Sequence, residues 1–347
     1  MKTYRVAIVG LGRMGSTIDE EVVGYPSIAL PYSVAASCKA SERLELAAGS
    51  DLVEEKRRAF GDKWGVEALY EDYLEMIEVE RPDMVAVCTK GVLHAEMGVA
   101  VARAEVPMLY LEKAMACSMA EADAVRDACR EHGTVFNTGV LRRFDNRYHA
   151  ARALIAQGEI GKVSVAVHFS RSNLLHGHVH SIDTLSYLLG DPKIARVRGE
   201  LLPEDLAIEN NRLDEDPVSR YHLEFEDGAE AWTIPAGHWE FEVVGSEGAI
   251  RSRNNGVGWE LRKVEPGRGG RPSVEAAAFP EVEPRSAVVE CLEDLVAAHE
   301  SGQPSLGNVE VTHHVTEACF AVAESHRRNG ARVAPSEVDR DLYIFHV

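Results

Sequence analysis

The stretch that decides the fold is Val6-Ala7-Ile8-Val9-Gly10-Leu11-Gly12-Arg13-Met14-Gly15. A short apolar run leads into a G-x-G-x-x-G pattern that opens onto a helix-compatible stretch, and this order predicts a dinucleotide-binding βα unit. Gly10 would permit the tight turn, Gly12 would let the backbone approach a pyrophosphate, and Gly15 would let the helix pack on the strand. The pyrophosphate would lie at the helix N-terminus, where backbone N–H groups lack internal partners. The alternative is a glycine-rich turn of some other α/β protein.

The bulk composition excludes several classes of function. With 347 residues the chain is long enough for two domains. Its formal charge of −19 argues against nucleic acid and anionic membranes as partners, since neither attracts an acidic surface. No apolar run approaches the ~20 residues that cross a bilayer, and the first residues lead into a strand without a signal peptide. The six cysteines form no C-x-x-C pair, so we expect reduced, buried thiols in a cytoplasmic protein.

Strand and helix patterns alternate through the first 140 residues. Apolar runs predict strands at residues 44–49, 84–88, 108–111 and 135–139. The run at 84–88 is continuous, as expected for a parallel strand that is buried on both faces. Ser118 and Glu121 form a capping box at the start of a helix. This alternation predicts an α/β chain whose residues 1–141 form a Rossmann-type, doubly wound parallel sheet.

The pattern changes in the second part of the chain. Consecutive strands are predicted at residues 162–170, 218–225, 230–235, 241–244 and 249–253. A hairpin signal at Glu226-Asp227-Gly228 favours antiparallel pairing. Residues 142–347 are therefore predicted to form an α+β domain with a largely antiparallel, open sheet. Its two last helices, at about 287–301 and 309–328, are expected to be able to pack back on the first domain.

Asp51, at the end of the second predicted strand, is the candidate ligand of the cofactor ribose. It lies 36 residues after Gly15, whereas the usual spacing is about 20. We interpret residues 24–42 as an inserted loop and short helix that account for the excess. A carboxylate accepts hydrogen bonds from a ribose diol and repels a 2′-phosphate, so NAD is expected rather than NADP. The alternative role for Asp51 is that of a helix N-cap.

Two clusters carry side chains suited to proton transfer. Lys113 ends a strand on the carboxyl edge of the sheet, where open α/β sheets bind ligands. Beside a cationic nicotinamide ring its pKa would fall and it could exchange protons; otherwise it is a surface lysine. In His176-Gly177-His178-Val179-His180, the first and last histidines lie at i and i+4 on one face of a predicted helix. Histidine titrates near neutrality and suits proton transfer; otherwise these rings pack or line a loop. The H-x-H-x-H spacing is not that of a structural zinc site, so no metal is predicted.

The chain resembles the Gfo/Idh/MocA oxidoreductases, the glucose–fructose oxidoreductase and inositol dehydrogenase family, through seven segments in the same order. The segments are Gly10–Gly15, Thr89–His94, Glu112–Ala114, Gly139–Phe144, Gly158–Val163, His180–Asp183 and Glu242–Gly248. Two of them depart from the family's pattern. Ala114 stands where the E-K-P motif has proline, and Leu141 stands where the G-x-N-x-R segment has asparagine.

The resemblance implies a proton relay made of a lysine, a histidine and an aspartate four residues before that histidine. Lys113 and His180 match the first two, but His176 occupies the aspartate position. An imidazole there can accept a proton, yet it can become positive where the family has a negative group. This departure leaves the substrate class open and favours an anionic substrate, with Arg171 nearby in sequence.

The resemblance also implies the remaining site residues. Cofactor binding is predicted at Gly10, Gly12, Arg13, Met14, Gly15, Ser50, Asp51, Thr89, His94, Glu112 and Lys113. Catalysis is predicted at Lys113, His180 and His176, and substrate binding at Arg143, Arg171, His176 and His180.

Together these residues imply an NAD-dependent dehydrogenase that acts on a sugar, polyol or sugar acid. Residues 142–347 would then bind the substrate and form a homodimer or homotetramer. Three alternatives stay open: a transient-redox glycosidase or lyase of the same family, a non-catalytic nucleotide sensor, and a metal enzyme built on the histidines.

Overall fold

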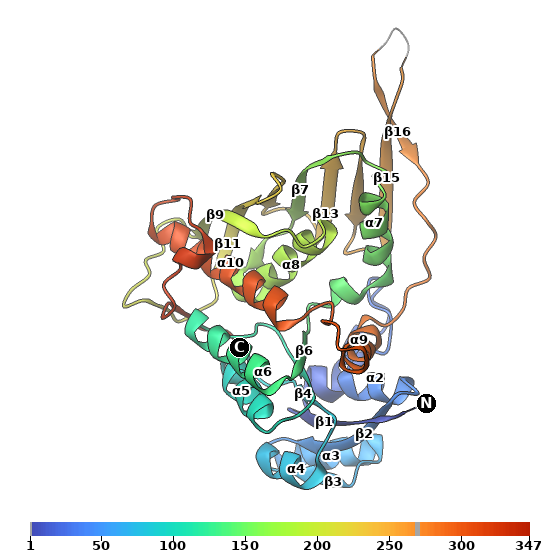
Figure 1. Ribbon diagram of the computed structural model, residues 1–347, viewed down its shortest axis with the longest axis vertical. Coiled ribbons are helices and arrows are strands. Elements are labelled where there is room, and N and C mark those ends of the chain that lie inside the picture. The colour runs from blue at the N-terminus through green and yellow to red at the C-terminus, as the bar shows by residue number, and fades with distance from the viewer. Residues whose placement is uncertain (1, 268–270) are drawn as a thin grey trace. The chain divides into compact units, whose positions relative to one another are not determined.

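The computed structural model describes residues 2–267 and 271–347, which form two compact units (Figure 1). Unit 1 comprises Met1–Phe144, Arg285–His313 and His346–Val347, and unit 2 comprises Asp145–Pro284 and His314–Phe345. The first division lies close to the boundary that was predicted after residue 141. Residues 285–313 also belong to unit 1, and they include the helix at 287–301, one of the two that were expected to be able to pack back on the first domain.

Unit 1 is built on a parallel sheet with the strand order β3-β2-β1-β4-β5-β6, which is that of a Rossmann fold. The strands are β1 Tyr4–Val9, β2 Leu44–Ser50, β3 Ala68–Tyr70, β4 Met84–Val87, β5 Met108–Leu111 and β6 Val135–Thr138. Every residue of β4 and β5 is buried, because these strands lie in the middle of a sheet that is covered on both faces. The predicted doubly wound sheet is thus confirmed.

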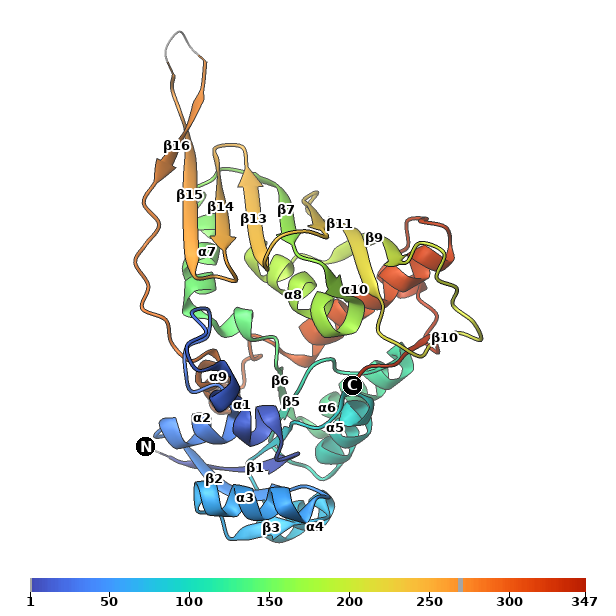
Figure 2. The same ribbon diagram turned by 180° about the vertical axis from the view of Figure 1, so that it is seen from behind.

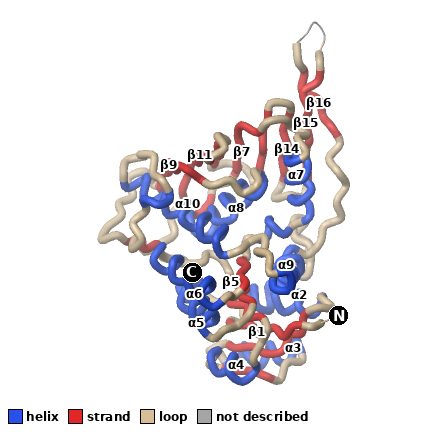
Figure 3. The backbone as a smooth tube through the Cα atoms, in the orientation of Figure 1, coloured by secondary structure: helices blue, strands red, loops and turns tan. Residues whose placement is uncertain are grey.

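Helices alternate with these strands (Figure 3). They are η1 Arg13–Thr17, α1 Ile18–Val22, α2 Val34–Ala40, α3 Glu54–Trp64, α4 Tyr73–Glu80, η2 Gly91–Leu93, α5 His94–Arg103, α6 Met119–His132 and η3 Leu141–Phe144. The predicted cap of α6 is present, since Ser118 Oγ accepts the N–H of Glu121 at 3.2 Å. The Glu121 carboxylate reaches one residue further than a capping box requires, to the N–H of Cys117 at 2.8 Å. Helix α2 is the short helix expected within residues 24–42.

Helix α9, Ala287–Ser301, completes the core of unit 1 although it follows far along the chain. Its Val288, Leu292 and Leu295 belong to the same buried cluster as Ile8 and Tyr110 of the sheet. Asn137 of β6 donates to the carbonyl oxygen of Cys291 at 3.0 Å, which fixes the helix to the last strand. Figure 1 shows α9 beside α2, so two segments far apart in sequence cover one face of the sheet.

Unit 2 contains, within its described residues, a nine-stranded sheet of order β16-β15-β14-β13-β7-β12-β11-β8, with β9 paired to β11 (Figure 2). The strands are β7 Val163–Phe169, β8 Ser172–Asn173, β9 Ile194–Leu202, β11 Val218–Phe225, β12 Glu230–Ile234, β13 Glu240–Gly245, β14 Gly248–Arg253, β15 Gly258–Glu265 and β16 Ser273–Ala277. Only the β7–β12 pair is parallel among these described pairings, so the prediction of a largely antiparallel sheet is confirmed. Strands β10 Arg212–Leu213 and β17 Tyr343–Ile344 form a separate parallel pair.

The helices of unit 2 pack on one face of this sheet. They are α7 Asn146–Ala156, η4 Leu174–His178, α8 Val179–Leu188, η6 Pro335–Glu337 and α10 Val309–Arg327, of which the part from His314 lies in unit 2. Gly199 of β9 lies so close to Val322 of α10 that a Cβ would stand 2.7 Å from the Val322 Cα. On β12, in contrast, the side chains of Trp232 and Ile234 are each 43% exposed.

Two further properties bear on the expectations from composition. The six cysteines are free thiols, and all except Cys88 are fully buried. Burial raises the pKa of the Cys38 and Cys129 thiols to about 12, so these two are unreactive in the folded protein. Among the residues that the structure describes, no helix is both long and apolar enough to cross a membrane.

Candidate functional site

The glycine-rich loop joins β1 to η1 and leaves no room for side chains at two positions. Gly10 has a φ of +89°, and a Cβ on it would lie 2.7 Å from the carbonyl oxygen of Cys88, after β4. A Cβ on Gly15 would collide with the carbonyl oxygen of Gly10. A Cβ on Gly12 would meet only Lys56 Nζ, at 4.0 Å, so the loop is open at the glycine that was expected to face a pyrophosphate. These three positions fit the bound dinucleotide that the motif predicts.

Asp51 lies directly against this loop. Its Oδ2 accepts the N–H of Leu11 at 3.0 Å, and its Oδ1 accepts the N–H of Val53 at 3.0 Å. The residue that caps α3 is Val53, so Asp51 is not the N-cap of this helix. Each carboxylate oxygen keeps a further lone pair for a ribose hydroxyl. The ammonium group of Lys56 is 3.6 Å from Oδ2, a neighbour that the sequence pattern did not reveal.

Three other predicted cofactor ligands have partners of their own. Arg13 forms an exposed ion pair with Glu21 at 2.8 Å, and its hydrogen bond to that carboxylate raises the arginine pKa. Met14 is partly buried and packs against the core of unit 1. The hydroxyl of buried Ser50 donates to the carbonyl oxygen of Glu71 at 3.3 Å. Cofactor contacts by these three residues stay predictions.

The segment after β4 contains Thr89 and His94. A Cβ on Gly10 would lie 3.1 Å from Thr89 Cγ2, so this segment touches the glycine-rich loop. His94 begins α5 and is 1% exposed, with Nδ1 at 2.7 Å from the carbonyl oxygen of Ala114 and Nε2 at 3.2 Å from that of Thr89. Its ring is therefore enclosed by protein, whereas the sequence predicted that it contacts the cofactor.

Glu112 and Lys113 follow β5 at the same carboxyl edge. Glu112 is buried, and its carboxylate accepts the hydroxyl of Tyr110 and, at 3.2 Å, the backbone N–H of Lys113. A Cβ on Gly139 would lie 2.6 Å from Glu112 Oε1, so the glycine allows the segment after β6 to approach this carboxylate. Burial raises the pKa of the Tyr110 hydroxyl well above its ordinary value, which keeps it protonated as a donor. Glu112 thus holds the backbone that carries Lys113.

The three predicted histidines have different environments. Helical structure begins at Leu174 with the π-helical turn η4, and α8 continues it, so the region that contains them is helical as predicted. The carboxylate of Asp216 accepts the N–H groups of Leu175 and His176, at 2.8 and 2.6 Å, and so fixes the start of the turn. His176 is exposed and His180 is half-buried.

His178 is fully buried and has a structural role. Its Nδ1 lies 2.9 Å from Ser181 Oγ, and its Nε2 lies 2.9 Å from the carbonyl oxygen of Ser219 on β11. Burial lowers the pKa of His178 to about 4, so the ring is neutral at pH 7. The sequence left its role open, and the structure shows a link between α8 and the sheet.

One aromatic side chain, Trp239 from the loop between β12 and β13, lies beside the helix that carries His180. The indole of Trp239 lies edge-on to the His180 ring with 6.3 Å between centroids, and it is 4.9 Å from the buried His168 ring. A Cβ on Gly177 would lie 3.5 Å from the same indole. Sequence reasoning missed Trp239, because the loop between β12 and β13 has no motif that marks it.

The predicted site residues are divided between the two units. The glycine-rich loop, Asp51, Thr89 and Lys113 all belong to unit 1, whereas His176, His180 and the exposed Arg171 belong to unit 2. A relay of Lys113 with His180 therefore remains a prediction. Arg143 belongs to unit 1 and is 1% exposed, so its predicted contact with a substrate has no support from its surroundings.

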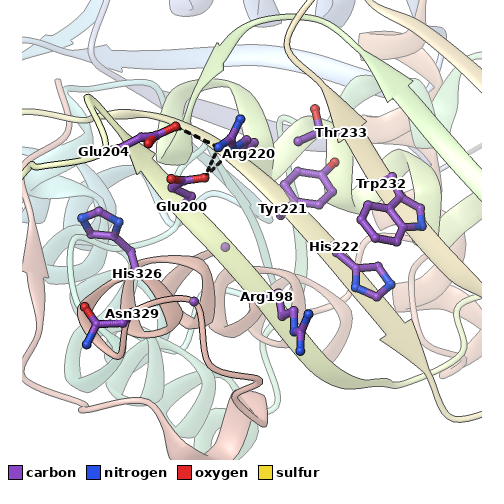
Figure 4. Close-up of a pocket in the computed structure, with 12 residues that line it drawn as sticks. Arg198, Glu200, Glu204, Arg220, Tyr221, His222, Trp232, Thr233, His326 and Asn329 are labelled. Carbon is purple, nitrogen blue, oxygen red and sulfur yellow. Dashed lines mark hydrogen bonds and ion pairs between the residues drawn. The ribbon is translucent and has the colours of Figure 1, made fainter.

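Unit 2 also contains a pocket of about 520 Å³, whose described lining includes no residue of η4 or α8 (Figure 4). Its described lining includes Arg198, Glu200, Glu204, Arg220, Tyr221, His222, Trp232, Thr233, His326 and Asn329. Arg220 is neutralised by Glu200 and Glu204. None of the residues predicted for catalysis lines it among those described, and residues 2–267 and 271–347 contain no group of three or more metal-ligating side chains.

The strand order, the glycine-rich turn and the acidic residue after β2 define unit 1 as a dinucleotide-binding Rossmann domain, followed by an α+β domain. Residues 4–140 match the family described as "Oxidoreductase family, NAD-binding Rossmann fold". This match covers the dinucleotide-binding part of the chain, which is thus similar in sequence to the NAD-binding domain of the Gfo/Idh/MocA oxidoreductases.

Curated relatives match part of the chain in sequence, and solved structures share its fold. The myo-inositol 2-dehydrogenase of Thermotoga maritima is 27% identical over 201 residues, so the match spans 54% of this chain and 55% of that protein. The scyllo-inositol 2-dehydrogenase (NAD(+)) of Bacillus subtilis is 27% identical over 71% of this chain and 72% of its own length. The fold resembles that of the aldose-aldose oxidoreductase of Caulobacter crescentus, with a TM-score of 0.76, 20% identity and coverage of 96% and 100% of the two chains.

Proposed function

We propose that this chain is an NAD-dependent dehydrogenase that oxidises a hydroxyl group of a sugar, a polyol or a sugar acid. The observation that supports it most is the meeting of three segments at one edge of the unit 1 sheet. The glycine-rich loop after β1 touches the segment after β4, and Asp51 after β2 binds the same loop through Leu11. Open α/β sheets bind ligands at this edge. Two of the relatives are named as inositol 2-dehydrogenases, which supports a polyol as one of these substrate classes.

The chain's own residues would bind the cofactor and move the proton. The backbone of the glycine-rich loop would hold the pyrophosphate and Asp51 the ribose diol. NAD, when bound, supplies the acceptor for the hydride that leaves the substrate carbon. Lys113, whose backbone is held by the buried Glu112, would accept the hydroxyl proton or receive it from His180. A positioned acid or base of this kind contributes typically ~10²–10⁴-fold to the rate.

The departure at His176 decides which substrate class should be tested first. If this imidazole is protonated it would attract a carboxylate, and the exposed Arg171 carries a second positive charge in the same unit. A sugar acid is therefore the first substrate class to test, followed by neutral polyols such as the inositols.

The test is a panel of sugar acids, inositols and aldoses, in which NADH formation and product are both measured. Net NADH formation with one class supports the proposed dehydrogenase. Product without a net change in NADH would instead indicate the transient-redox glycosidase or lyase. Binding of NADH without any turnover across the panel would favour a nucleotide sensor and contradict the proposal.

A further inference from the structure

His94 connects two loops at the carboxyl edge of the unit 1 sheet. Its Nδ1 is 2.7 Å from the carbonyl oxygen of Ala114, in the loop after β5. Its Nε2 is 3.2 Å from the carbonyl oxygen of Thr89, in the loop after β4. The side chain is 1% exposed and begins the ten-residue helix α5, so its position is fixed by packing.

The two contacts differ in strength. A neutral imidazole carries one N–H, and both partners here are carbonyl oxygens that can only accept. Burial lowers the pKa of His94, with the nearby Glu112 acting in the opposite direction and Lys113 in the same direction as burial. The ring is therefore neutral at pH 7, and we place its N–H on Nδ1, which donates to the Ala114 carbonyl oxygen in the shorter contact.

The Ala114 carbonyl belongs to the residue next to Lys113. On the other side, the backbone N–H of Lys113 is bound by Glu112, whose carboxylate is buried. The backbone around this lysine is thus held by one hydrogen bond on each side, and the lysine itself is half-buried. Loss of either bond would release the peptide from which the lysine side chain extends.

We propose that His94 is a positioning residue, which holds the backbone of Ala114 so that the amine of Lys113 is presented at a fixed place. The inference rests on the proposed function, in which Lys113 takes part in proton transfer. It assigns to His94 no contact with the cofactor or substrate.

Two variants of nearly equal shape distinguish the effect of the hydrogen bond from His94 to Ala114 from the effect of side-chain packing at position 94. In His94→Asn the amide nitrogen is the same number of bonds from Cβ as Nδ1, so it can still donate to the Ala114 carbonyl. In His94→Leu a methyl group takes that place and the donor is lost. His94→Gln extends the amide by one bond, towards Thr89, and should behave like the leucine variant. The melting temperature of each variant without cofactor shows whether it is folded.

The experiment measures turnover, NADH affinity and the reactivity of Lys113 towards a low dose of acetic anhydride, quantified by mass spectrometry. The exposed Lys39 on α2 is the internal reference. We expect His94→Leu to lose about 10²-fold in turnover, as a displacement of ~1 Å can cause, with NADH affinity near the wild-type value. The labelling of Lys113 relative to Lys39 should change in this variant. His94→Asn should recover most of the turnover and the wild-type labelling.

Equal loss of turnover and equal labelling of Lys113 in the asparagine and leucine variants would overturn the proposal. The packing of the His94 ring, and not its hydrogen bond, would then determine the placement of Lys113. If the leucine variant does not fold, the comparison of glutamine with asparagine takes its place. If wild-type protein turns over no sugar or polyol, the proposed function fails. The labelling comparison then still decides whether His94 holds Lys113.

Discussion

Lys113 stands at the end of β5 with its backbone N–H bound to a buried carboxylate, so its place is set by the sheet and not by a mobile loop. We expect Lys113→Met to reduce turnover at least ~10²-fold, because the variant lacks the group that exchanges the proton. NADH affinity should persist, since the glycine-rich loop and Asp51 are untouched. Steady-state kinetics and fluorescence titration with NADH measure the two effects. Near-normal turnover would remove Lys113 from the mechanism.

The contact between Asp51 and Lys56 bears on the choice of cofactor. Wild-type protein should bind NAD more tightly than NADP, because the carboxylate repels a 2′-phosphate. Asp51→Ser should narrow the preference for NAD over NADP for two reasons. The carboxylate that repels the 2′-phosphate is removed. Lys56, which lies 3.6 Å from that carboxylate in the wild-type protein, can then pair with the phosphate. Dissociation constants for both cofactors measure this.

The double variant Asp51→Ser with Lys56→Ala is the matched control for this pair. It should regain less affinity for NADP than the single variant, because the cation is absent. A wild-type preference for NADP would show that our interpretation of Asp51 is wrong.

At the scale of elements, the link from α8 to β11 through His178 should make stability depend on pH. The folded-state pKa of His178 is about 4, below its ordinary value of 6.5, so the native state prefers the neutral ring. The stabilisation is present above pH 6.5 and is lost as the pH falls towards 4. The full effect is on the order of 3 kcal/mol.

Urea unfolding at pH 7 and pH 5 tests this dependence. Between pH 7 and pH 5 the free energy of unfolding should fall by about 2 kcal/mol more in wild-type protein than in His178→Gln, because glutamine does not titrate. Equal losses in the two proteins would show that the His178 contacts do not carry the effect.

Several strands could be predicted because their pattern of apolar residues indicates which side chains are buried. Strands β4 and β5 are continuous apolar runs, and most of β11 alternates apolar and polar residues. Strand β3 was missed because its three residues are all half-buried and too few to show a period. Strand β9 was missed because Arg196, Arg198 and Gly199 interrupt its apolar residues. Its alternation of Val197 and Leu201 with exposed charges was the available signal.

The candidate site was predictable where it depends on local backbone chemistry. The glycines and Asp51 follow from their places beside strands. The partners Asp216 and Trp239 did not follow, because each reaches its histidine from a distant part of the chain. Lys56 is close to Asp51 in sequence, but no motif marks its position in the first turn of α3. The enclosure of His94 and His178 also depends on tertiary packing, which one chain's sequence does not display.

At the scale of the whole molecule, the uncovered face of the unit 2 sheet is the expected surface for self-association. On β12, Trp232 is 43% exposed with its ring stacked on His222 at 3.7 Å, and Ile234 is also 43% exposed, so this strand presents apolar side chains to solvent. Exposed apolar patches of this kind mark protein contacts. We expect a homodimer or homotetramer, and light scattering that gave the mass of one 38.1 kDa chain at micromolar concentration would contradict this.

The variant Trp232→Glu tests whether this face makes the contact. It should shift the association equilibrium towards the monomer, because a charge would be buried without a partner. Val274→Glu on the edge strand β16 is the control for a charge added elsewhere on unit 2. An unchanged oligomer in the Trp232 variant would place the contact on another surface.

The division of unit 1 between distant parts of the chain constrains how the protein is made by the ribosome. The sheet is complete at β6, but α9, which closes its core, ends at Ser301. The 157 residues from Asp145 to Ser301 must be translated in between. At about 5–20 residues per second this takes roughly 10 to 30 s. During that time Ile8 and Tyr110 lack their covering helix, so the nascent chain presents an apolar surface that a chaperone can bind.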